Sequence, residues 1–302
     1  MLKQTLKILF STLLIFAFVL PGTVIAEDTA TSLETVTEPA LRCTLIKKSI
    51  LKCNDITLDE NVDVLDFCRE KSTAIESVSS STTTNEYGIP ESIISQVKFR
   101  GIDVSRHQYD IDWNAVKADG VDFAIIRAGF GNDPKQKDPY FEKNYAEAKS
   151  AGIAVGAYWY SYADSVDDAV READLFMSVI QGKQFEYPIF FDIEDNSQQK
   201  LGSALLTDMT IAFLMRVASS GYYIGLYTNP NWITYFLEKD RLGDYDKWLA
   251  HWTSEPMFGP EFGGMWQYAS DGKVNGINGN VDLNFSYKDY ETIIKENHLN
   301  GF

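Results

Sequence analysis

From Phe99 onward, short β-rich runs alternate with helical stretches, and this alternation constrains the fold more than any other feature of the chain. Eight runs have the composition of strands, and we expect them at residues 101–105, 123–129, 155–162, 187–194, 223–228, 248–253, 265–269 and 281–285. Helices are expected between the earlier strands, at residues 113–118, 139–151, 166–180 and 207–219. This order predicts an α/β fold, a flattened, TIM-like (β/α) barrel preceded by a small N-terminal segment. The last three strands lack long helices between them, so we expect the barrel to be irregular.

The fourth of these strands runs directly into two acids, Asp192 and Glu194. Successive strand residues point to opposite faces, so these two would share one face, with their Cα atoms about 7 Å apart. A buried acid pair is costly unless its pKa values are split, with one carboxylate ionised and the other protonated. Cleavage of a glycosidic bond needs that division, so the pair points to chemistry on a sugar.

Two further acids are expected at the same end of the barrel, Asp103 on the first strand and Asp282 on the last. Catalytic groups of such barrels lie at the C-terminal face of the strands, which would bring all four acids together. Aromatic and amide side chains are expected beside them as substrate-binding groups, because rings stack on sugar faces and amides bond to N-acetyl groups. These candidates are Tyr158, Tyr160, Tyr227, Trp252 and Gln267.

Several motifs in order resemble glycoside hydrolase family 25, the lysozyme family of N-acetylmuramidases, from Arg100 to about Tyr290. They are Gly-Ile-Asp-Val-Ser at 101–105, Phe-Ala-Ile-Ile-Arg-Ala at 123–128, Gly-Ala-Tyr-Trp-Tyr at 156–160, Phe-Asp-Ile-Glu at 191–194, Trp-Leu-Ala at 248–250, Trp-Gln-Tyr at 266–268 and Val-Asp-Leu-Asn at 281–284. Trp159 stands where many members of this family have histidine.

The resemblance implies hydrolysis of the β-1,4 bond between N-acetylmuramic acid and N-acetylglucosamine in peptidoglycan. By position, Glu194 matches the general acid/base, and Asp192 matches the carboxylate that assists the 2-acetamido group or stabilises developing positive charge. Asp103 and Asp282 match acids that line the floor and tune the other two. Retention through the acetamido group is favoured, and direct attack by water with inversion stays open, because sequence does not fix the carboxylate separation.

Two alternatives stay open from the residues alone. A chitinase-like hydrolase of N-acetylglucosamine polymers would use a similar acid pair, although Phe190 and Phe191 stand where it would have a longer Asp-rich run. A non-catalytic cell-wall-binding module could keep the cleft without turnover, and loss of the acid would be its signature.

The N-terminal third has a different composition. Residues 1–26 have Lys3 and Lys7 before an apolar run and a small-residue site ending at Ala26, which predicts a secretory signal peptide and an exported or cell-wall-associated protein. Residues 27–96 form a predicted segment with a Ser/Thr-rich linker, and residues 97–302 the catalytic barrel. The segment contains Cys43, Cys53 and Cys68, two of which could pair in an oxidising compartment. Its role and any protein partner cannot be read from the sequence.

Charge and composition exclude several classes of function. The chain has 27 basic and 43 acidic residues, a net charge of −16, which repels nucleic acid and anionic membranes. After signal cleavage no segment is long and apolar enough for stable insertion into a membrane. The three histidines, His107, His251 and His298, lack metal-ligand spacing, and neither a serine-nucleophile motif nor a phosphate-binding loop is found, so we expect no metal and no cofactor.

Overall fold

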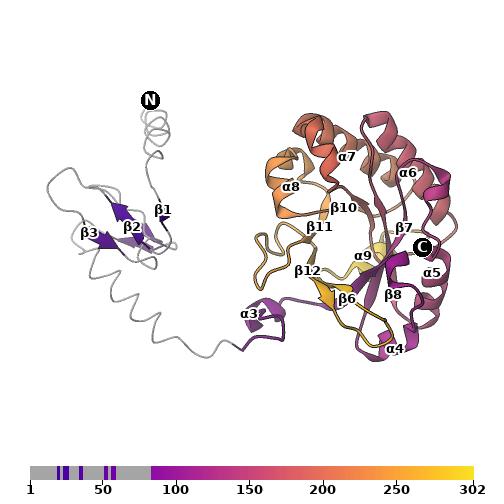
Figure 1. Ribbon diagram of the computed structural model, residues 1–302, viewed down its shortest axis with the longest axis horizontal. Coiled ribbons are helices and arrows are strands. Elements are labelled where there is room, and N and C mark those ends of the chain that lie inside the picture. The colour runs from indigo at the N-terminus through magenta and orange to yellow at the C-terminus, as the bar shows by residue number, and fades with distance from the viewer. Residues whose placement is uncertain (1–18, 21–22, 27–33, 37–50, 54–55, 59–82) are drawn as a thin grey trace. The chain divides into compact units, whose positions relative to one another are not determined.

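The structure is a computed structural model of the chain, and it describes residues 19–20, 23–26, 34–36, 51–53, 56–58 and 83–302 (Figure 1). The chain forms two compact units, residues 1–82 and residues 83–302. The boundary lies before the residue where the catalytic barrel was predicted to begin. None of the described helices is long and apolar enough to cross a membrane.

In the first unit, two small antiparallel groups of strands are described. One is a three-stranded sheet of β1 (Val19–Leu20), β2 (Thr23–Ala26) and β3 (Glu34–Val36), and the other pairs β4 (Leu51–Cys53) with β5 (Ile56–Leu58). Most of the predicted signal peptide, as well as Cys43 and Cys68, lies outside the described residues. The predictions of cleavage and of cysteine pairing therefore stay predictions.

The second unit is built on a closed barrel of eight strands, which confirms the predicted α/β barrel. In chain order the strands are β6 (Phe99–Val104), β7 (Phe123–Phe130), β8 (Ala154–Tyr160), β9 (Ile189–Asp192), β10 (Ile224–Thr228), β11 (Asp246–Ala250), β12 (Met265–Gly272) and β13 (Val281–Ser286). Each predicted strand is present. The fourth is shorter than expected, since β9 ends at Asp192 and the chain has left the sheet before Glu194.

Helices cover the outside of the barrel between the early strands (Figure 1). The four predicted helices correspond to α4 (Trp113–Ala118), α5 (Phe141–Ser150), α6 (Val166–Ile180) and α7 (Ser203–Ala218). Ser165 caps α6, where its side chain accepts a hydrogen bond from the backbone N–H of Asp168. A short α8 (Pro230–Tyr235) follows β10, and α9 (Tyr290–Glu296) follows the last strand.

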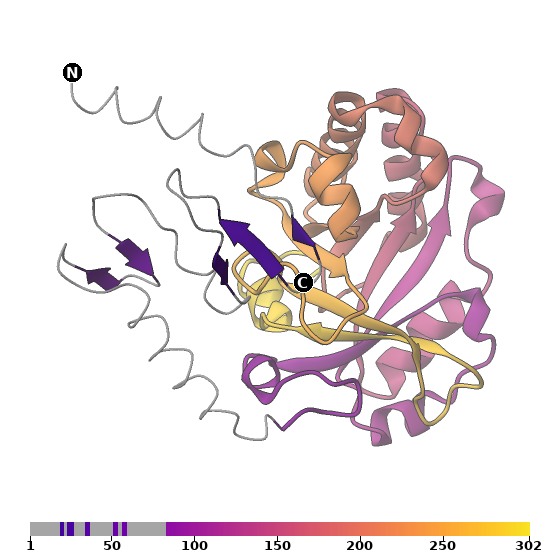
Figure 2. The ribbon, with the colours of Figure 1, turned by 60° about the vertical axis from the view of Figure 1, so that its left-hand side comes forward.

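The barrel is irregular where the long helices are missing. Seven strands, β6 to β12, pair in parallel wherever they are neighbours, but β13 runs antiparallel to both β12 and β6. Figure 2 shows β12 and β13 as neighbouring strands at the orange-to-yellow end of the chain. An antiparallel connection needs no helical crossover, which explains why the sequence has none there. As a result, the start of β13, not its end, lies at the C-terminal face of the other strands.

Alternation along the strands separates the barrel interior from the layer under the helices. On β7, for example, Phe123 and Ile125 belong to the inner cluster, whereas Ala124 and Ile126 belong to the outer core. The period of two is the ordinary geometry of a strand. Trp159 follows this rule as an outward residue of β8, where it packs against Phe176 of α6 with ring centroids 5.5 Å apart.

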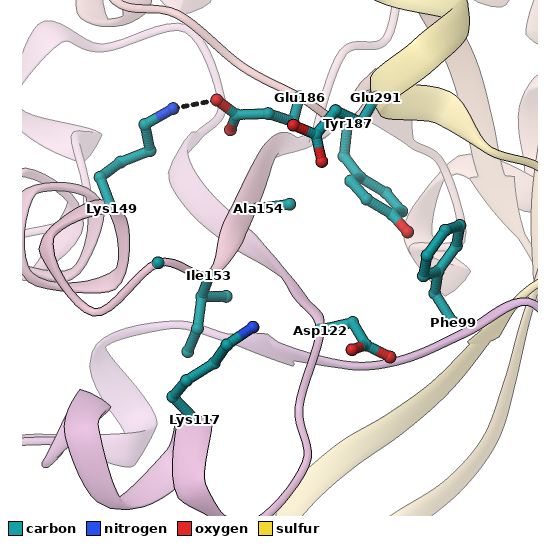
Figure 3. Close-up of a pocket in the computed structure, with 10 residues that line it drawn as sticks. Phe99, Lys117, Asp122, Lys149, Ile153, Ala154, Glu186, Tyr187 and Glu291 are labelled. Carbon is teal, nitrogen blue, oxygen red and sulfur yellow. Dashed lines mark hydrogen bonds and ion pairs between the residues drawn. The ribbon is translucent and has the colours of Figure 1, made fainter.

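At the N-terminal end of the strands the barrel is filled by aromatic side chains. Tyr290 of α9 packs against Tyr187 and Tyr223, with ring centroids 5.4 and 5.7 Å away. A cavity of about 300 Å³ opens at this end (Figure 3), where Lys149 forms an ion pair with Glu186. Active sites of such barrels lie at the opposite face.

Residues 83–98, ahead of the first barrel strand, pack against the same unit. Ile89 is fully buried, and the ring of Tyr87 meets that of Tyr268 edge-on at 5.3 Å. A single helical turn, α3 (Glu91–Ile94), follows, and the backbone N–H of Lys98 donates to the carbonyl of Ser286. The last 14 residues of the predicted segment 27–96, residues 83–96, are thus part of the barrel unit.

Candidate active site

A cavity of about 270 Å³, the central cavity, opens at the C-terminal face of the barrel. It collects all four predicted acids together with three of the five predicted substrate-binding residues. Its lining consists of Asp103, Val104, Ser105, His107, Gln108, Arg127, Tyr158, Tyr160, Asp192, Glu194, Tyr227, Trp248 and Asp282.

Strand register explains why these residues meet. Asp282 near the start of β13 is the direct antiparallel partner of Asp103 near the end of β6. On the other side of the barrel, Asp192 is level with Tyr160 of β8 and Tyr227 of β10. Inward-facing positions at one end of a closed barrel converge on one space, so residues from seven strands, all except β12, line one cavity.

Glu194 reaches the cavity from the loop after β9 rather than from the strand. The backbone of Ile193 is fixed on both sides, since its N–H donates to the carbonyl of Tyr227 and its carbonyl accepts from the Thr228 hydroxyl at 2.8 Å. Asn229 then donates from Nδ2 to Oε2 of Glu194 at 3.4 Å. The strand argument for a shared face therefore holds for Asp192 alone, while the loop brings Glu194 to the same cavity.

Asp103 and Asp282 form a hydrogen-bonded carboxyl pair at the floor. Asp103 is 5% exposed, and its Oδ2 accepts hydrogen bonds from Gln267 Nε2 and Asn284 Nδ2, both at 2.8 Å. Burial raises the pKa of Asp103 to about 6, against these two donors. Burial and the neighbouring Asp103 charge raise the pKa of Asp282 to about 9, so Asp282 holds the proton that the pair shares.

Asp192 and Glu194 form the second pair of acids. Burial, followed by the charges of Glu194 and Asp103, raises the pKa of Asp192 well above its ordinary value. Burial also raises the pKa of Glu194, which the Asn229 donor opposes. Both carboxyls therefore resist ionisation, and their mutual repulsion keeps them from ionising together.

One carboxylate oxygen of this pair has no partner. Oδ1 of Asp192 is buried and accepts no hydrogen bond from any of the described residues. Buried polar atoms are nearly always bonded in folded proteins, and an exception needs an explanation. Because Asp192 lines the cavity, the oxygen is suited to accept a hydrogen bond from a bound molecule.

Gln267 and Trp252 do not line the central cavity. Gln267 is 1% exposed, and its Oε1 accepts from the Tyr227 hydroxyl at 3.1 Å and from Trp252 Nε1 at 2.9 Å. With one Nε2 hydrogen donated to Asp103, three of the four hydrogen-bonding positions of the Gln267 amide are used by groups of the described chain. Gln267 thus lies outside the lining of the central cavity and is bonded to Asp103, Tyr227 and Trp252, and its substrate contact stays a prediction.

Trp252 belongs to a neighbouring cavity of about 540 Å³, the outer cavity. This cavity is lined by Glu194, Asn229, Pro230, Asn231, Thr234, Tyr235, Ala250, His251, Trp252 and Met257. The side chains of Tyr235, Trp252 and Met257 are largely exposed there. Glu194 is the one residue that lines both cavities, so a chain molecule that occupies both would pass this carboxyl.

Three polar residues that shape the site were not among the candidates. Arg127 is an inward residue of β7 that forms an ion pair with Asp138 at 2.8 Å. It lies two residues after the inward Ile125 in an apolar strand, so the sequence already indicated that Arg127 points into the barrel. Asn284 shares a face with Asp282 and was detectable in the same way. Asn229 lies after the end of β10, and no periodicity marks it.

A grouping suited to a metal ion is not found in the described part of the chain, where no cluster of three or more His, Cys, Asp or Glu side chains has that arrangement. The four acids instead form the two pairs described above. Their chemistry is that of proton transfer and charge stabilisation at a polar, partly enclosed cavity.

Comparison with known proteins agrees with this arrangement. The model of the family described as glycosyl hydrolases family 25 matches residues 102–277. Protein YegX of Escherichia coli K12 is 34% identical over 199 residues, which are 61% of this chain and 68% of YegX. Lysozyme M1 of Streptomyces globisporus is 31% identical over 198 residues, 61% of this chain and 66% of that protein. The crystal structure of a bacterial lysozyme from Streptomyces coelicolor superposes with a TM-score of 0.55 at 31% identity, covering 62% of this chain and 90% of that one.

Proposed function

This chain belongs to family 25 of the glycosyl hydrolases, and we propose that it is a muramidase that cleaves the β-1,4 bond between N-acetylmuramic acid and N-acetylglucosamine in peptidoglycan. The names of two similar proteins, both lysozymes, support this substrate class. The observation that carries the proposal is that Asp192 and Glu194, two acids with raised pKa values, line one cavity, and that none of the described residues donates a hydrogen bond to the buried Oδ1 of Asp192.

In the proposed reaction, Glu194 is the general acid. Its raised pKa keeps the proton on the carboxyl until it is given to the glycosidic oxygen of the departing sugar. Because Glu194 lines both cavities, the scissile bond lies at their junction, with the muramic acid ring in the central cavity and the leaving N-acetylglucosamine in the outer cavity. The exposed Trp252 and Tyr235 offer rings on which the leaving sugar can stack.

Asp192 assists through the substrate's own 2-acetamido group. Its free Oδ1 accepts a hydrogen bond from the acetamido N–H, which directs the acetamido carbonyl oxygen at C1 as the C1–O bond breaks. This hydrogen bond favours the ionised form of Asp192, so binding of the sugar leaves the shared proton on Glu194. Glu194 then removes a proton from the water that opens the cyclic intermediate at C1, and the configuration at C1 is retained.

The test is hydrolysis of purified peptidoglycan by the parent chain and by Glu194→Gln and Asp192→Asn, measured as soluble glycan released. General acid–base catalysis contributes about 10²- to 10⁴-fold, so each variant should lose activity by at least about 10²-fold. Thermal unfolding of both variants controls for folding. Full activity of Glu194→Gln would remove this residue from the acid role, and hydrolysis of chitin in preference to peptidoglycan would favour the chitinase alternative.

The stereochemical outcome separates the two mechanisms. Proton NMR of a soluble glycan during the first turnovers should show the β anomer of the new reducing end. Initial appearance of the α anomer would mean direct attack by water, with inversion.

Action outside the cytoplasm is part of the proposal, because peptidoglycan lies there and residues 1–26 have the pattern of a signal peptide. N-terminal sequencing of the protein recovered from the medium or cell wall of a bacterial host should begin at Glu27. A protein that stays in the cytoplasm with Met1 intact would contradict it.

A further inference from the structure

A small pocket of about 160 Å³, the arginine–aromatic pocket, adjoins the central cavity. It is lined by Arg106, His107, Arg127, Phe130, Tyr160 and Tyr162. Three of these residues, His107, Arg127 and Tyr160, also line the central cavity, so the two spaces share a wall. Nothing in the proposed reaction uses this pocket.

The pocket is cationic in a protein whose net charge is −16. Its lining includes two arginines and no acidic side chain. The guanidinium carbons of Arg106 and Arg127 lie 5.7 and 5.8 Å from the centroid of the Phe130 ring, so one ring orients both cations. Arg106 is exposed, which leaves its guanidinium accessible to a ligand in solution.

A buried carboxylate fixes this arrangement from below. Oδ2 of Asp138, which is 1% exposed, accepts from Arg127 Nε at 2.8 Å and from the backbone N–H of Arg106 at 3.0 Å. Asp138 therefore offsets the charge of Arg127 and holds the start of the Arg106 turn in place. Burial and the two arginines lower the pKa of His107, so its ring is neutral near neutral pH and the cationic group at the pocket mouth is Arg106.

The shared wall lies beside Asp192. Tyr160 of β8 is the direct strand partner of Asp192 on β9, and Arg127 lines the same central cavity as these two residues. In the proposed complex Asp192 faces the acetamido group on C2 of the sugar. The substituent on the adjacent C3 oxygen therefore leaves the ring next to this wall.

That substituent distinguishes muramic acid from glucosamine. Muramic acid has a lactyl ether on its C3 oxygen, which ends in a carboxyl group or, in intact wall, in a peptide with its own carboxylates. Chitin has a neutral hydroxyl group there. Arginine suits carboxylates because its planar guanidinium can donate two parallel hydrogen bonds.

We propose that the arginine–aromatic pocket binds a carboxylate on the C3 arm of the muramic acid residue whose bond is cleaved, with Arg106 as the specificity-determining residue. This rests on the proposed function for the placement of the sugar. The Arg106–carboxylate contact would explain why the site selects a muramic acid polymer over a neutral N-acetylglucosamine polymer.

The test measures binding in the Glu194→Gln background, in which strands stay intact, so the result does not depend on turnover. Three ligands are compared by calorimetry: peptide-free glycan strands with free lactyl carboxylates, the same strands with those carboxylates converted to methylamides, and strands that retain their peptides. Each is measured with and without Arg106→Gln or Arg106→Lys. Arg216→Gln, which removes an exposed guanidinium of α7 that is paired with Asp174, is the matched control.

On strands with free carboxylates, Arg106→Gln should raise Kd about tenfold, Arg106→Lys should raise it less, and Arg216→Gln should leave it unchanged. On the methylamide strands Arg106→Gln should have no effect. An effect confined to the peptide-bearing strands would assign the bound carboxylate to the peptide instead of the lactyl group. Equal effects on all three ligands, or none on any, would overturn the inference, whereas binding without hydrolysis by the parent chain would instead count against the proposed function.

Discussion

Replacement of Asp282 by Asn should make the protein more stable, by an amount that grows with pH. In the folded chain the pKa of Asp282 is raised to about 9, chiefly by burial and by the Asp103 charge, whereas the unfolded chain has the ordinary value of 3.8. Above that value the unfolded state releases a proton that the folded state keeps, so the parent chain loses stability as the pH rises from about 4 to about 9. Asparagine has no proton to lose and can still donate to Asp103.

The size of the effect follows from the pKa difference. Each pH unit between the unfolded and the folded pKa is worth about 1.36 kcal/mol. At pH 7 the limit is therefore about 4 kcal/mol in the free energy of unfolding, and at pH 5 it is about 2 kcal/mol. The Asp282 carboxyl is partly exposed, and solvent screens it, so we expect about 2–4 kcal/mol at pH 7.

The assay is urea unfolding of the parent and of Asp282→Asn at several pH values between 4 and 8. Asp244→Asn, which alters an exposed carboxylate before β11, is the matched control and should leave the pH dependence unchanged. A difference between parent and variant that stays constant across this range would refute the reasoning. So would a variant that is less stable than the parent at pH 8.

Two further predictions concern activity. Asn229→Ala removes the hydrogen-bond donor that lowers the pKa of Glu194. The fall of kcat at alkaline pH should therefore move to higher pH. A pH–rate profile whose alkaline limb does not move would contradict this prediction. Trp252→Phe keeps a ring in the outer cavity but removes the 2.9 Å hydrogen bond to Gln267. The KM for peptidoglycan fragments should therefore rise about two- to tenfold, with little change in kcat. A KM equal to that of the parent would show that this hydrogen bond does not position the ring.

The barrel could be predicted because its early strands are apolar runs separated by amphipathic helices, so each strand can be located in the sequence from its own composition. The antiparallel placement of β13 could not, since strand composition is the same in either direction. It is this reversal that brings Asp282 to the C-terminal face from the start of its strand. The four acids do line one cavity, as expected. Asp282, however, reaches it from the start of an antiparallel strand and not, as expected, from the end of a parallel one.

The site was predictable in its charged groups and less so in its amides. Asp192 stands out because acids rarely follow fully apolar strands, and its place in the cavity agrees with that signal. Gln267 and Asn284 each look like an ordinary polar residue of a strand, and their contacts with Asp103 depend on which residues the closed barrel brings together. The exposure of Trp252 in a separate cavity depends on the loop after β11, which has no periodic pattern.

The central claim is that the bond after muramic acid is the one cleaved, with Glu194 as the acid. It is tested most directly by digestion of purified peptidoglycan, reduction of the products with borohydride, and identification of the new sugar alcohols by mass spectrometry. The account predicts reduced muramic acid from the parent chain and none from Glu194→Gln. Reduced glucosamine from the parent chain would show that the other glycosidic bond is cleaved and would contradict the account.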